Sequence, residues 1–355
     1  MTTPARAPWW RPDEFARRRP FLRVRAAALD AVRGFFRAEG FVEVETPALQ
    51  ASPGLEPHLQ AFSTEIVSPD RASRRRLFLH TSPEFAMKKL LVAGEPRIFQ
   101  ICRTYRNAER APTHHPEFTM IEWYRAGAGY AAIMEDCEGL LRAVARAAGR
   151  TSFAWNGVES DPFAPWQRLT VAEAFHAAGL DLHECVGGEV RAPDARRFRE
   201  RAAAIGIAVR PEDSWDDVFF RVFLERIEPR LGHPVPTLLR DYPIAMAALA
   251  RAKPGDPRLA ERVELYVSGL ELANGFGELT DAAQQRARFE RDMDLKARLY
   301  GERYPIDEDF LAALAHGMPD SAGIALGFDR LVMLASGAAR IEDVLWAPVA
   351  EGEMP

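Results

Sequence analysis

The chain of 355 residues is 47% hydrophobic and 27% charged, which is typical of a globular protein with a large buried core. Its formal net charge of −5 differs from the basic balance of domains that phosphate contacts hold on nucleic acid. No apolar run approaches membrane-spanning length, residues 1–20 contain no hydrophobic signal segment, and the three cysteines are far apart, so we expect a cytoplasmic protein with reduced, buried thiols.

The first expected elements are a helix and a strand. Apolar side chains recur at helical spacing through residues 22–38, and Gly40 follows as a stop signal. A strand then begins at Val42. We expect these elements to follow an N-terminal extension of residues 1–20 and to open a single domain over residues 21–350, because no linker-like tract divides the chain.

A basic segment comes before the next expected strand. Arg71 and the run Arg74-Arg75-Arg76 precede residues 77–79 on what we interpret as a loop. A solvated hairpin tip is the simpler interpretation, since charge runs usually face water. The alternative is a landing site for an acidic protein, because complementary charge accelerates encounter.

Residues 98–125 contain two alternating runs around a loop rich in arginine and histidine, which predicts a strand, a loop and a strand. Period-two alternation in the second run places on one face Phe118, Met120, Glu122 and Tyr124. Arg106 lies at the mouth of this hairpin. An ordinary half-solvated hairpin would show this pattern, and so would the lining of a cavity for a charged, partly aromatic ligand.

The chain then becomes helical. An amphipathic helix is predicted over residues 133–148, and the pairs Thr170–Glu173 and Ser214–Asp217 have the spacing of capping boxes at the start of two further helices. Residues 150–235 therefore read as a helical insertion.

Residues 261–280 form a second cluster of charged side chains. Apolar residues alternate with Glu264 and Tyr266 up to a turn at Ser268-Gly269. The alternation then resumes, with a leucine on each side of Glu271. Asn274-Gly275 breaks it again before Glu278, so all three glutamates can face one cavity. Solvated, outward glutamates are one interpretation, and a site for Mg²⁺ and an ammonium group is the other.

The last expected elements are a long helix ending at Gly301, a strand at residues 323–327 and a helix from Asp329-Arg330. The small residues of the strand would let a ligand lie against the backbone. The sequence contains no G-x-x-x-x-G-K-[ST] loop, so we expect arginines and Mg²⁺ to bind any nucleotide.

Several of these segments resemble the class II aminoacyl-tRNA synthetases in their lysyl form. The hairpin resembles motif 2, with Thr81-Ser82-Pro83-Glu84 upstream, Tyr105-Arg106-Asn107 in the first strand, and His114, Pro116-Glu117-Phe118-Thr119 and Glu122-Trp123-Tyr124 after the loop. Residues 269–276, GLELANGF, also resemble this family. Residues 323–330, GIALGFDR, resemble motif 3, and the first helix and strand resemble motif 1. The resemblance fits best the short lysyl-tRNA synthetase paralogues that attach β-lysine to elongation factor P.

This resemblance implies an α+β fold, an antiparallel sheet flanked by helices with the helical insertion between motifs 2 and 3. It also implies formation of an aminoacyl adenylate from ATP, with Arg106 on the α-phosphate, Arg330 on the γ-phosphate and Phe118 stacked on adenine. The implied ATP-binding set is Arg106, Asn107, Ala108, His114, His115, Phe118, Glu271, Leu272, Gly327 and Arg330. Mg²⁺ would be held by Glu264 and Glu271.

The amino-acid substrate, lysine or (R)-β-lysine, carries two amino groups. By resemblance Glu278 and Tyr124 would bind the distal ammonium, and the other substrate-binding residues would be Ser82, Pro83, Glu84, Glu122 and Ala325. Ala325 stands where the tRNA-charging enzymes usually have glycine, which favours the elongation factor P branch.

The resemblance implies a homodimer, elongation factor P as acceptor and no membrane. Only about 20 residues precede the first helix, too few for an anticodon-binding domain of ~100 residues, so we expect tRNA not to be the acceptor. Two alternatives stay open, a truncated synthetase that charges tRNA or makes a free adenylate, and a regulatory paralogue without catalysis. Two departures support the second, since Ala108 replaces the glutamate that reads the adenine amine and His115 replaces the usual asparagine.

Overall fold

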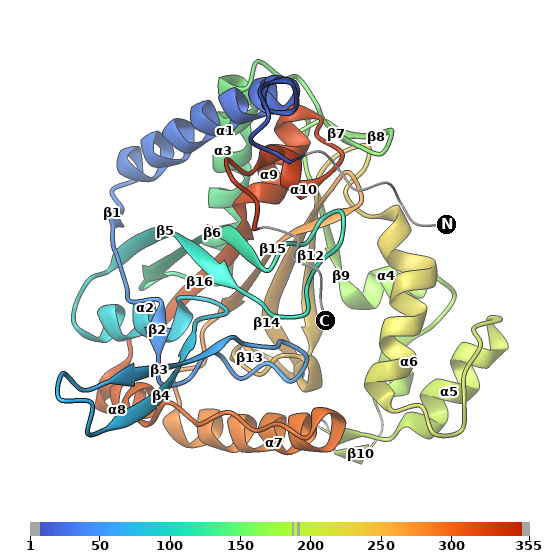
Figure 1. Cartoon of the computed structure of the whole chain (residues 1–355). Helices are drawn as coiled ribbons and strands as arrows, with labels where there is room; N and C mark the ends of the chain where they lie inside the picture. Colours follow the sequence, from blue (N-terminus) through green and yellow to red (C-terminus); the bar gives the residue numbers. More distant parts are fainter. Residues whose placement is uncertain (1–7, 187, 190–191, 350–355) are drawn as a thin grey trace.

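A mixed sheet of nine strands forms the centre of the computed structural model, which describes residues 8–186, 188–189 and 192–349 (Figure 1). The strand order is β1 (Val42–Glu43), β5 (Arg97–Tyr105), β6 (Glu117–Ala126), β16 (Ser321–Gly327), β15 (Leu270–Gly277), β14 (Asp256–Val267), β12 (Thr237–Pro243) and β9 (Gln167–Thr170), with β13 (Ala252–Lys253) beside β14. All pairs from β5 to β12 are antiparallel, while the outer pairs β1–β5 and β12–β9 are parallel. The expected α+β class with an antiparallel sheet is confirmed, and parallel pairs occur only at its two ends.

Helices cover one face of this sheet at the top of Figure 1. They are α1 (Pro12–Ala38), α3 (Tyr130–Ala147), α9 (Phe328–Ser336) and the short α10 (Ile341–Val344). Their apolar stripes meet alternate side chains of the strands, such as Ile121 and Trp123, in the largest core of the protein. These four helices therefore all lie on one face of the sheet. The remaining side chains of each strand point to the opposite face.

Helix α1 begins at Pro12, well before the expected start near residue 22. It therefore takes in much of the segment expected to be an N-terminal extension. Proline is suited to the first turn, and Asp13 and Glu14 lie where the helix dipole favours acidic groups. Pro20 lies inside the helix and does not end it, since the buried Arg18 and Leu22 on either side are packed.

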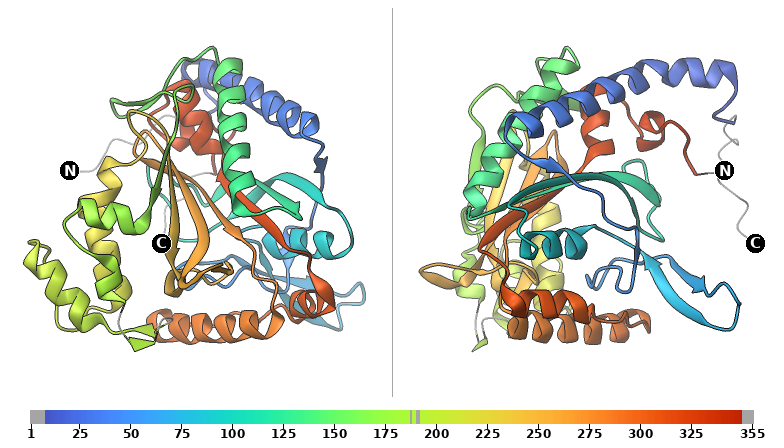
Figure 2. Two further views of the ribbon diagram at one scale, coloured as in Figure 1. Left: turned by 180° about the vertical axis from the view of Figure 1, so that it is seen from behind. Right: turned by 90° about the vertical axis from the view of Figure 1, so that its left-hand side faces the viewer.

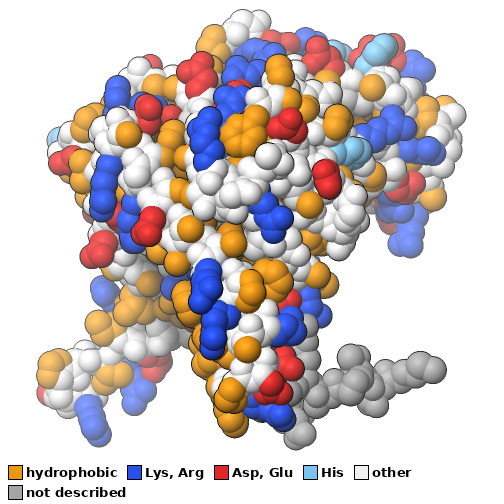
Figure 3. Space-filling view, turned by 90° about the horizontal axis from the view of Figure 1, so that it is seen from above, with side chains coloured by type: hydrophobic (Ala, Val, Ile, Leu, Met, Phe, Trp, Pro, Cys, Tyr) orange, Lys and Arg blue, Asp and Glu red, His pale blue; other side chains and the backbone are white. Residues whose placement is uncertain are grey.

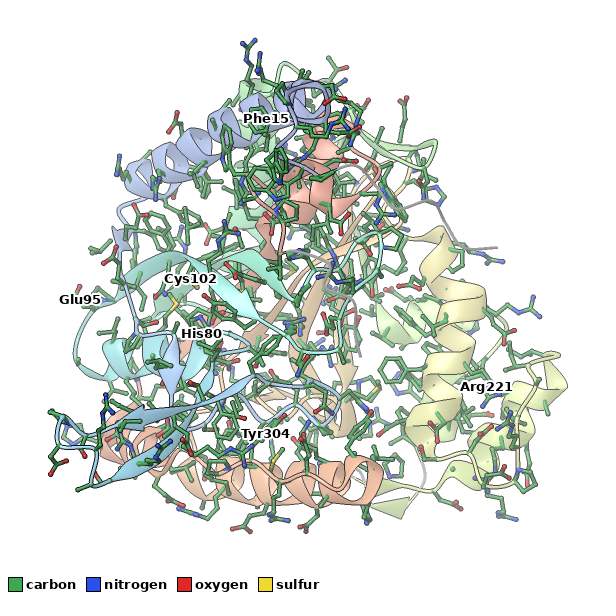
Figure 4. All side chains as sticks on the ribbon, viewed as in Figure 1. Phe15, His80, Glu95, Cys102, Arg221 and Tyr304 are labelled. Carbon is green, nitrogen blue, oxygen red and sulfur yellow. The ribbon has the colours of Figure 1, made fainter. Side chains whose placement is uncertain are left out.

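The opposite face of the sheet is enclosed by α2 (Glu84–Val92), α7 (Ala282–Tyr300), α8 (Glu308–Gly317) and a small sheet in the order β2 (Leu49–Gln50), β4 (Arg74–Leu79), β3 (Ser63–Val67). Tyr304 joins these parts, because its ring lies 5.2 Å from that of Phe78 and its hydroxyl accepts the amide of Ala61 at 2.9 Å (Figure 4). His80, also labelled there, marks where the small sheet meets β5, with its Nε2 2.7 Å from the carbonyl oxygen of Arg103. The β3–β4 hairpin projects outward (Figure 2), and its arginine run is exposed.

The insertion contains strands as well as helices. It comprises the hairpin β7 (Phe153–Trp155) and β8 (Val158–Ser160), β9 of the main sheet, α4 (Val171–Ala177), α5 (Ala195–Ala204), α6 (Trp215–Val222), short 3-10 and π turns, and the small pair β10 (Gly188–Glu189) and β11 (Ala192–Pro193). Both predicted capping boxes are confirmed, at Thr170 and Ser214. The insertion has the expected helices, and it also contributes β9 to the main sheet, where β9 is stabilised by pairing with the distant β12.

No helix within the described ranges combines the length and apolar character needed to cross a membrane. On the face shown in Figure 3, basic side chains are interspersed with acidic and apolar ones. That face offers no continuous field of one charge.

Candidate active site

A cavity of about 640 Å³ lies against the sheet face opposite α1 and α3. Side chains of β6, β15 and β16 line one wall, and the segment 55–59, α6 and α7 contribute the other side. Of the residues predicted for the site, the cavity brings together Ser82, Glu84, Arg106, His114, His115, Phe118, Glu271, Leu272, Ala325, Gly327 and Arg330.

The β5–β6 hairpin positions the first part of this site. Thr104 pairs with Phe118 and Gln100 with Glu122, so the predicted alternation is confirmed. The guanidinium of Arg106 lies over the ring of Phe118, 5.2 Å from its centroid, and its Nε is buried without a hydrogen-bond partner in the described structure. An aromatic surface and an arginine with unused donor capacity suit a ligand that is both aromatic and anionic.

Arg330, in the first turn of α9, is the second arginine of the cavity. It donates to the carbonyl oxygen of Glu271 at 2.7 Å and to that of Thr113 at 3.3 Å, and its Nη2 lies 2.7 Å from Nε2 of His114. Burial and Arg330 lower the pKa of His114, which favours the neutral ring that can accept this contact. Three contacts from two segments, residues 113–114 and β15, therefore hold the Arg330 fork in place.

The two predicted metal ligands have different surroundings. Glu264 accepts hydrogen bonds from Tyr242 at 2.5 Å and Tyr266 at 2.7 Å, and its other oxygen lies 2.5 Å from Nη2 of Arg262. Glu271 lines the cavity, and burial together with Glu264 raises its pKa to about 7. A buried carboxylate that lies near a second negative charge favours the binding of a divalent cation, so Glu271 suits direct coordination. Glu264 is less suited, because both of its oxygens already have hydrogen-bond partners.

Three glutamates predicted to bind amino groups form a buried cluster beyond the cavity. Glu122 accepts from Ser82 at 2.6 Å and from Tyr124 at 2.5 Å, and burial with Glu84 raises its pKa to about 8. Lys88 lies 2.5 Å from both Glu84 and Glu278. Among these residues only Ser82 and Glu84 lie on the cavity wall, and the others lie behind them.

Gly323 makes room for this cluster. A Cβ at this position would collide with the ring of Tyr124 and lie 2.8 Å from Oε1 of Glu278. Ala325, two residues along β16, pairs with Glu122 on one side and Asn274 on the other, and it reaches the cavity. The absence of a side chain at Gly323 thus leaves room for Tyr124 and Glu278, and Ala325 contributes to the cavity wall.

The residues predicted in the motif 2 loop contribute less to the lining of the cavity. Asn107 and Ala108 are outside the cavity lining, and Ala108 has a positive φ of 59°. His115 is buried, with Nδ1 2.6 Å from the carbonyl oxygen of Glu117 and Nε2 accepting the amide of Val349 at 3.3 Å. Both ring nitrogens of His115 are engaged with backbone groups, so its predicted ligand contact stays a prediction.

Sequence analysis missed several residues of the site. Glu56 and Asp292 line the cavity with raised pKa values, that of Asp292 about 7, both mainly because of burial. Arg262 donates to Asn274 at 3.2 Å, and both line the cavity. Lys88 follows Glu84 by one helical turn, which is a signal that the sequence does contain.

The chain is similar to known proteins of one family. Residues 14–351 match the family described as tRNA synthetases class II (D, K and N). The chain is 39% identical to a protein of Vibrio cholerae over 92% of this chain and 94% of the relative, and 40% identical to one of Pectobacterium carotovorum over 90% and 92%. A protein of Salmonella arizonae is 38% identical over 95% and 96%. All three relatives are named "Elongation factor P--(R)-beta-lysine ligase".

Proposed function

Because the chain belongs to the class II (D, K and N) tRNA synthetase family, and within it to the elongation factor P–(R)-β-lysine ligases, we propose that it joins (R)-β-lysine to a lysine side chain of elongation factor P. The reaction runs through an aminoacyl adenylate made from ATP. The observation that carries this proposal is a single cavity that extends from Arg106 and Arg330 to Glu84, where the buried carboxylate cluster begins. Such a cavity accepts the anionic and the cationic ends of the two reactants side by side.

The first half-reaction joins two anions, so the site must neutralise charge. Arg106 binds the α-phosphate that the amino-acid carboxylate attacks, and Phe118 stacks on the adenine. Arg330 binds the γ-phosphate, and its contacts with Glu271 and His114 hold the guanidinium in place beforehand. Glu271, together with Glu264, would hold Mg²⁺, which would supply further neutralisation of the phosphates.

The carboxylate cluster binds the two amino groups. Glu278 and Tyr124 receive the distal ammonium, and Ser82, Glu84 and Glu122 receive the other. In the second half-reaction the acceptor amine attacks the mixed anhydride and releases AMP.

The assembly proposed is a cytoplasmic homodimer formed through the motif 1 region. Side chains on the adjoining strands support this, since Val42 and Leu49 are about half exposed, at 51% and 47%. Half-exposed apolar side chains at these positions are available for contacts between subunits.

Elongation factor P, and not tRNA, is the expected acceptor. We expect the factor to gain the mass of one β-lysyl group when incubated with the protein, ATP and (R)-β-lysine, and we expect tRNA in a parallel reaction to stay uncharged. Intact-protein mass spectrometry and acid-precipitation of labelled tRNA measure the two products. Charged tRNA with unmodified factor would instead support a truncated synthetase, and no pyrophosphate exchange with any amino acid would support a regulatory paralogue.

Ala108 offers a test of the adenine end. Restoring the family's glutamate by Ala108→Glu should lower the KM for ATP by roughly tenfold, because a hydrogen bond to a charged group contributes about 1.5–3 kcal/mol. The positive φ of Ala108 strains alanine and glutamate alike, so the comparison reports the side chain. Ala111→Glu in the same loop is the control and should leave the KM unchanged, and equal KM values for wild type and Ala108→Glu would contradict the assignment.

A further inference from the structure

Lys88 is a buried charge beside the amino-acid pocket that the assigned reaction does not use. It lies on α2, one turn after Glu84, and its side chain is 1% exposed. Its ammonium lies 2.5 Å from Oε1 of Glu84 and 2.5 Å from Oε2 of Glu278. Both partners are carboxylates that the proposed function reserves for the amino groups of the substrate.

The cluster has an excess of negative charge even with this lysine. Glu84, Glu122 and Glu278, when ionised, bring three negative charges into a space that admits almost no water, and Lys88 balances one of them. Two negative charges are left. Uncompensated charges in such surroundings are costly, so the cluster favours a ligand that supplies two positive charges.

Other titratable groups that face the cluster do not change this balance. Burial raises the pKa of Tyr124 and raises that of Cys102 to about 12, so both stay neutral. Glu56 also lines the cavity, and burial together with the charge of Glu84 raises the pKa of Glu56, which favours its neutral form.

The pKa values around Lys88 agree with this geometry. Burial by itself would lower the pKa of Lys88, but Glu278 and Glu84 outweigh burial and raise it. Burial raises the pKa of Glu278 to about 8, and Lys88 opposes that shift. Lys88 therefore stays charged and keeps Glu278 closer to its ionised form.

We propose that Lys88 is a positioning residue that acts as an internal counter-cation. It bridges Glu84 and Glu278, and it sets the charge of the amino-acid pocket so that a substrate with two ammonium groups completes the neutralisation. The inference rests on the proposed function, because it assumes that these carboxylates bind the amino acid. Without Lys88 the pKa of Glu278 rises further, so less of this carboxylate is ionised near neutral pH and able to pair with a substrate ammonium.

The α2 helix contains a matched control. Lys89 has the same side chain and also two carboxylate partners, Asp307 at 2.9 Å and Asp309 at 2.8 Å, but it is partly exposed and points away from the pocket. Lys88→Met and Lys89→Met therefore remove equal charges from neighbouring positions, and only the first should affect the amino acid.

The experiment measures the KM values for (R)-β-lysine and ATP by pyrophosphate exchange at about pH 7 and about pH 8.5. Lys88→Met should raise the KM for β-lysine by about tenfold or more at the lower pH with the KM for ATP unchanged, and the loss should shrink at the higher pH as the carboxylates ionise. Lys88→Arg should recover most of the affinity. Lys89→Met should match wild type, and an equal β-lysine KM at both pH values for Lys88→Met and Lys89→Met would overturn the proposal.

Wild-type protein provides a second measurement that does not depend on the folding of a variant. The inhibitors 3-aminohexanoic acid and 6-aminohexanoic acid each keep one of the two ammonium groups of β-lysine. Each should bind at least about tenfold more weakly than β-lysine, since each leaves one carboxylate without a partner. An analogue that binds as tightly as β-lysine would refute the charge matching, whereas absence of exchange with any amino acid in wild type would refute the proposed function itself.

Discussion

Glu278→Ala should abolish amino-acid-dependent pyrophosphate exchange while ATP still binds. The carboxylate is 1% exposed and is the predicted partner of the distal ammonium. Leaving a buried charge without its partner costs about 3–5 kcal/mol, which corresponds to a loss of affinity of more than a hundredfold. Exchange kinetics and ATP binding by calorimetry measure the two effects separately.

The ion pair between Glu278 and Lys88 adds a structural consequence. Glu278→Ala also leaves Lys88 with Glu84 alone, so a lower melting temperature should accompany the loss of activity. Glu278→Gln keeps the shape of the side chain and should lose the amino acid with a smaller effect on melting. Glu308→Gln, which alters an exposed ion pair with Arg286, is the control and should behave as wild type. A near-normal KM for the amino acid in a folded Glu278 variant would disprove its role.

Arg106→Lys should lower kcat by about 100- to 1000-fold, the usual range for losing one preorganised charge donor at a reacting centre. Lysine keeps the positive charge but lacks the planar fork that matches phosphate oxygens. It also removes the guanidinium that lies over Phe118. The KM for the amino acid should change little, because the carboxylate cluster is not altered.

Arg103→Lys is a close control for this substitution. Arg103 lies in β5, three residues before Arg106, and is not among the residues that line the cavity. It donates to Thr119 at 3.0 Å, and its side chain is 42% exposed. Single-turnover measurements of adenylate formation would separate the chemical step from product release. A kcat for Arg106→Lys equal to that of Arg103→Lys would remove Arg106 from the reaction.

Local patterns in the sequence predicted much of the fold and of the site. Alternation in residues 117–126 predicted that Ile121 and Trp123 lie on one face of the strand and Glu122 on the other. The structure confirms this, with Ile121 and Trp123 in the main core and Glu122 in contact with Ser82 on the face that carries the cavity. The capping boxes at Thr170 and Ser214 and the turn at Ser268-Gly269 are also confirmed. These features depend on interactions between residues a few positions apart, so sequence spacing contains them.

Interactions between distant segments were not predictable in the same way. The start of α1 at Pro12 depends on packing against the last helices, where Arg17 lies 2.9 Å from Asp343. Strand β9 exists because it pairs with β12, which made the insertion more than helical.

The charges of the site show the same division. Sequence alone predicted several of its glutamates and arginines, because residue type and spacing carry the family motifs, but it did not predict Glu56 or Arg262. Only the tertiary structure decided what each charge touches, since Glu264 meets Tyr242 and Glu278 meets Lys88 across long stretches of chain. Electrostatic energy depends on distance and burial, and both are set when the sheet and its helices pack together.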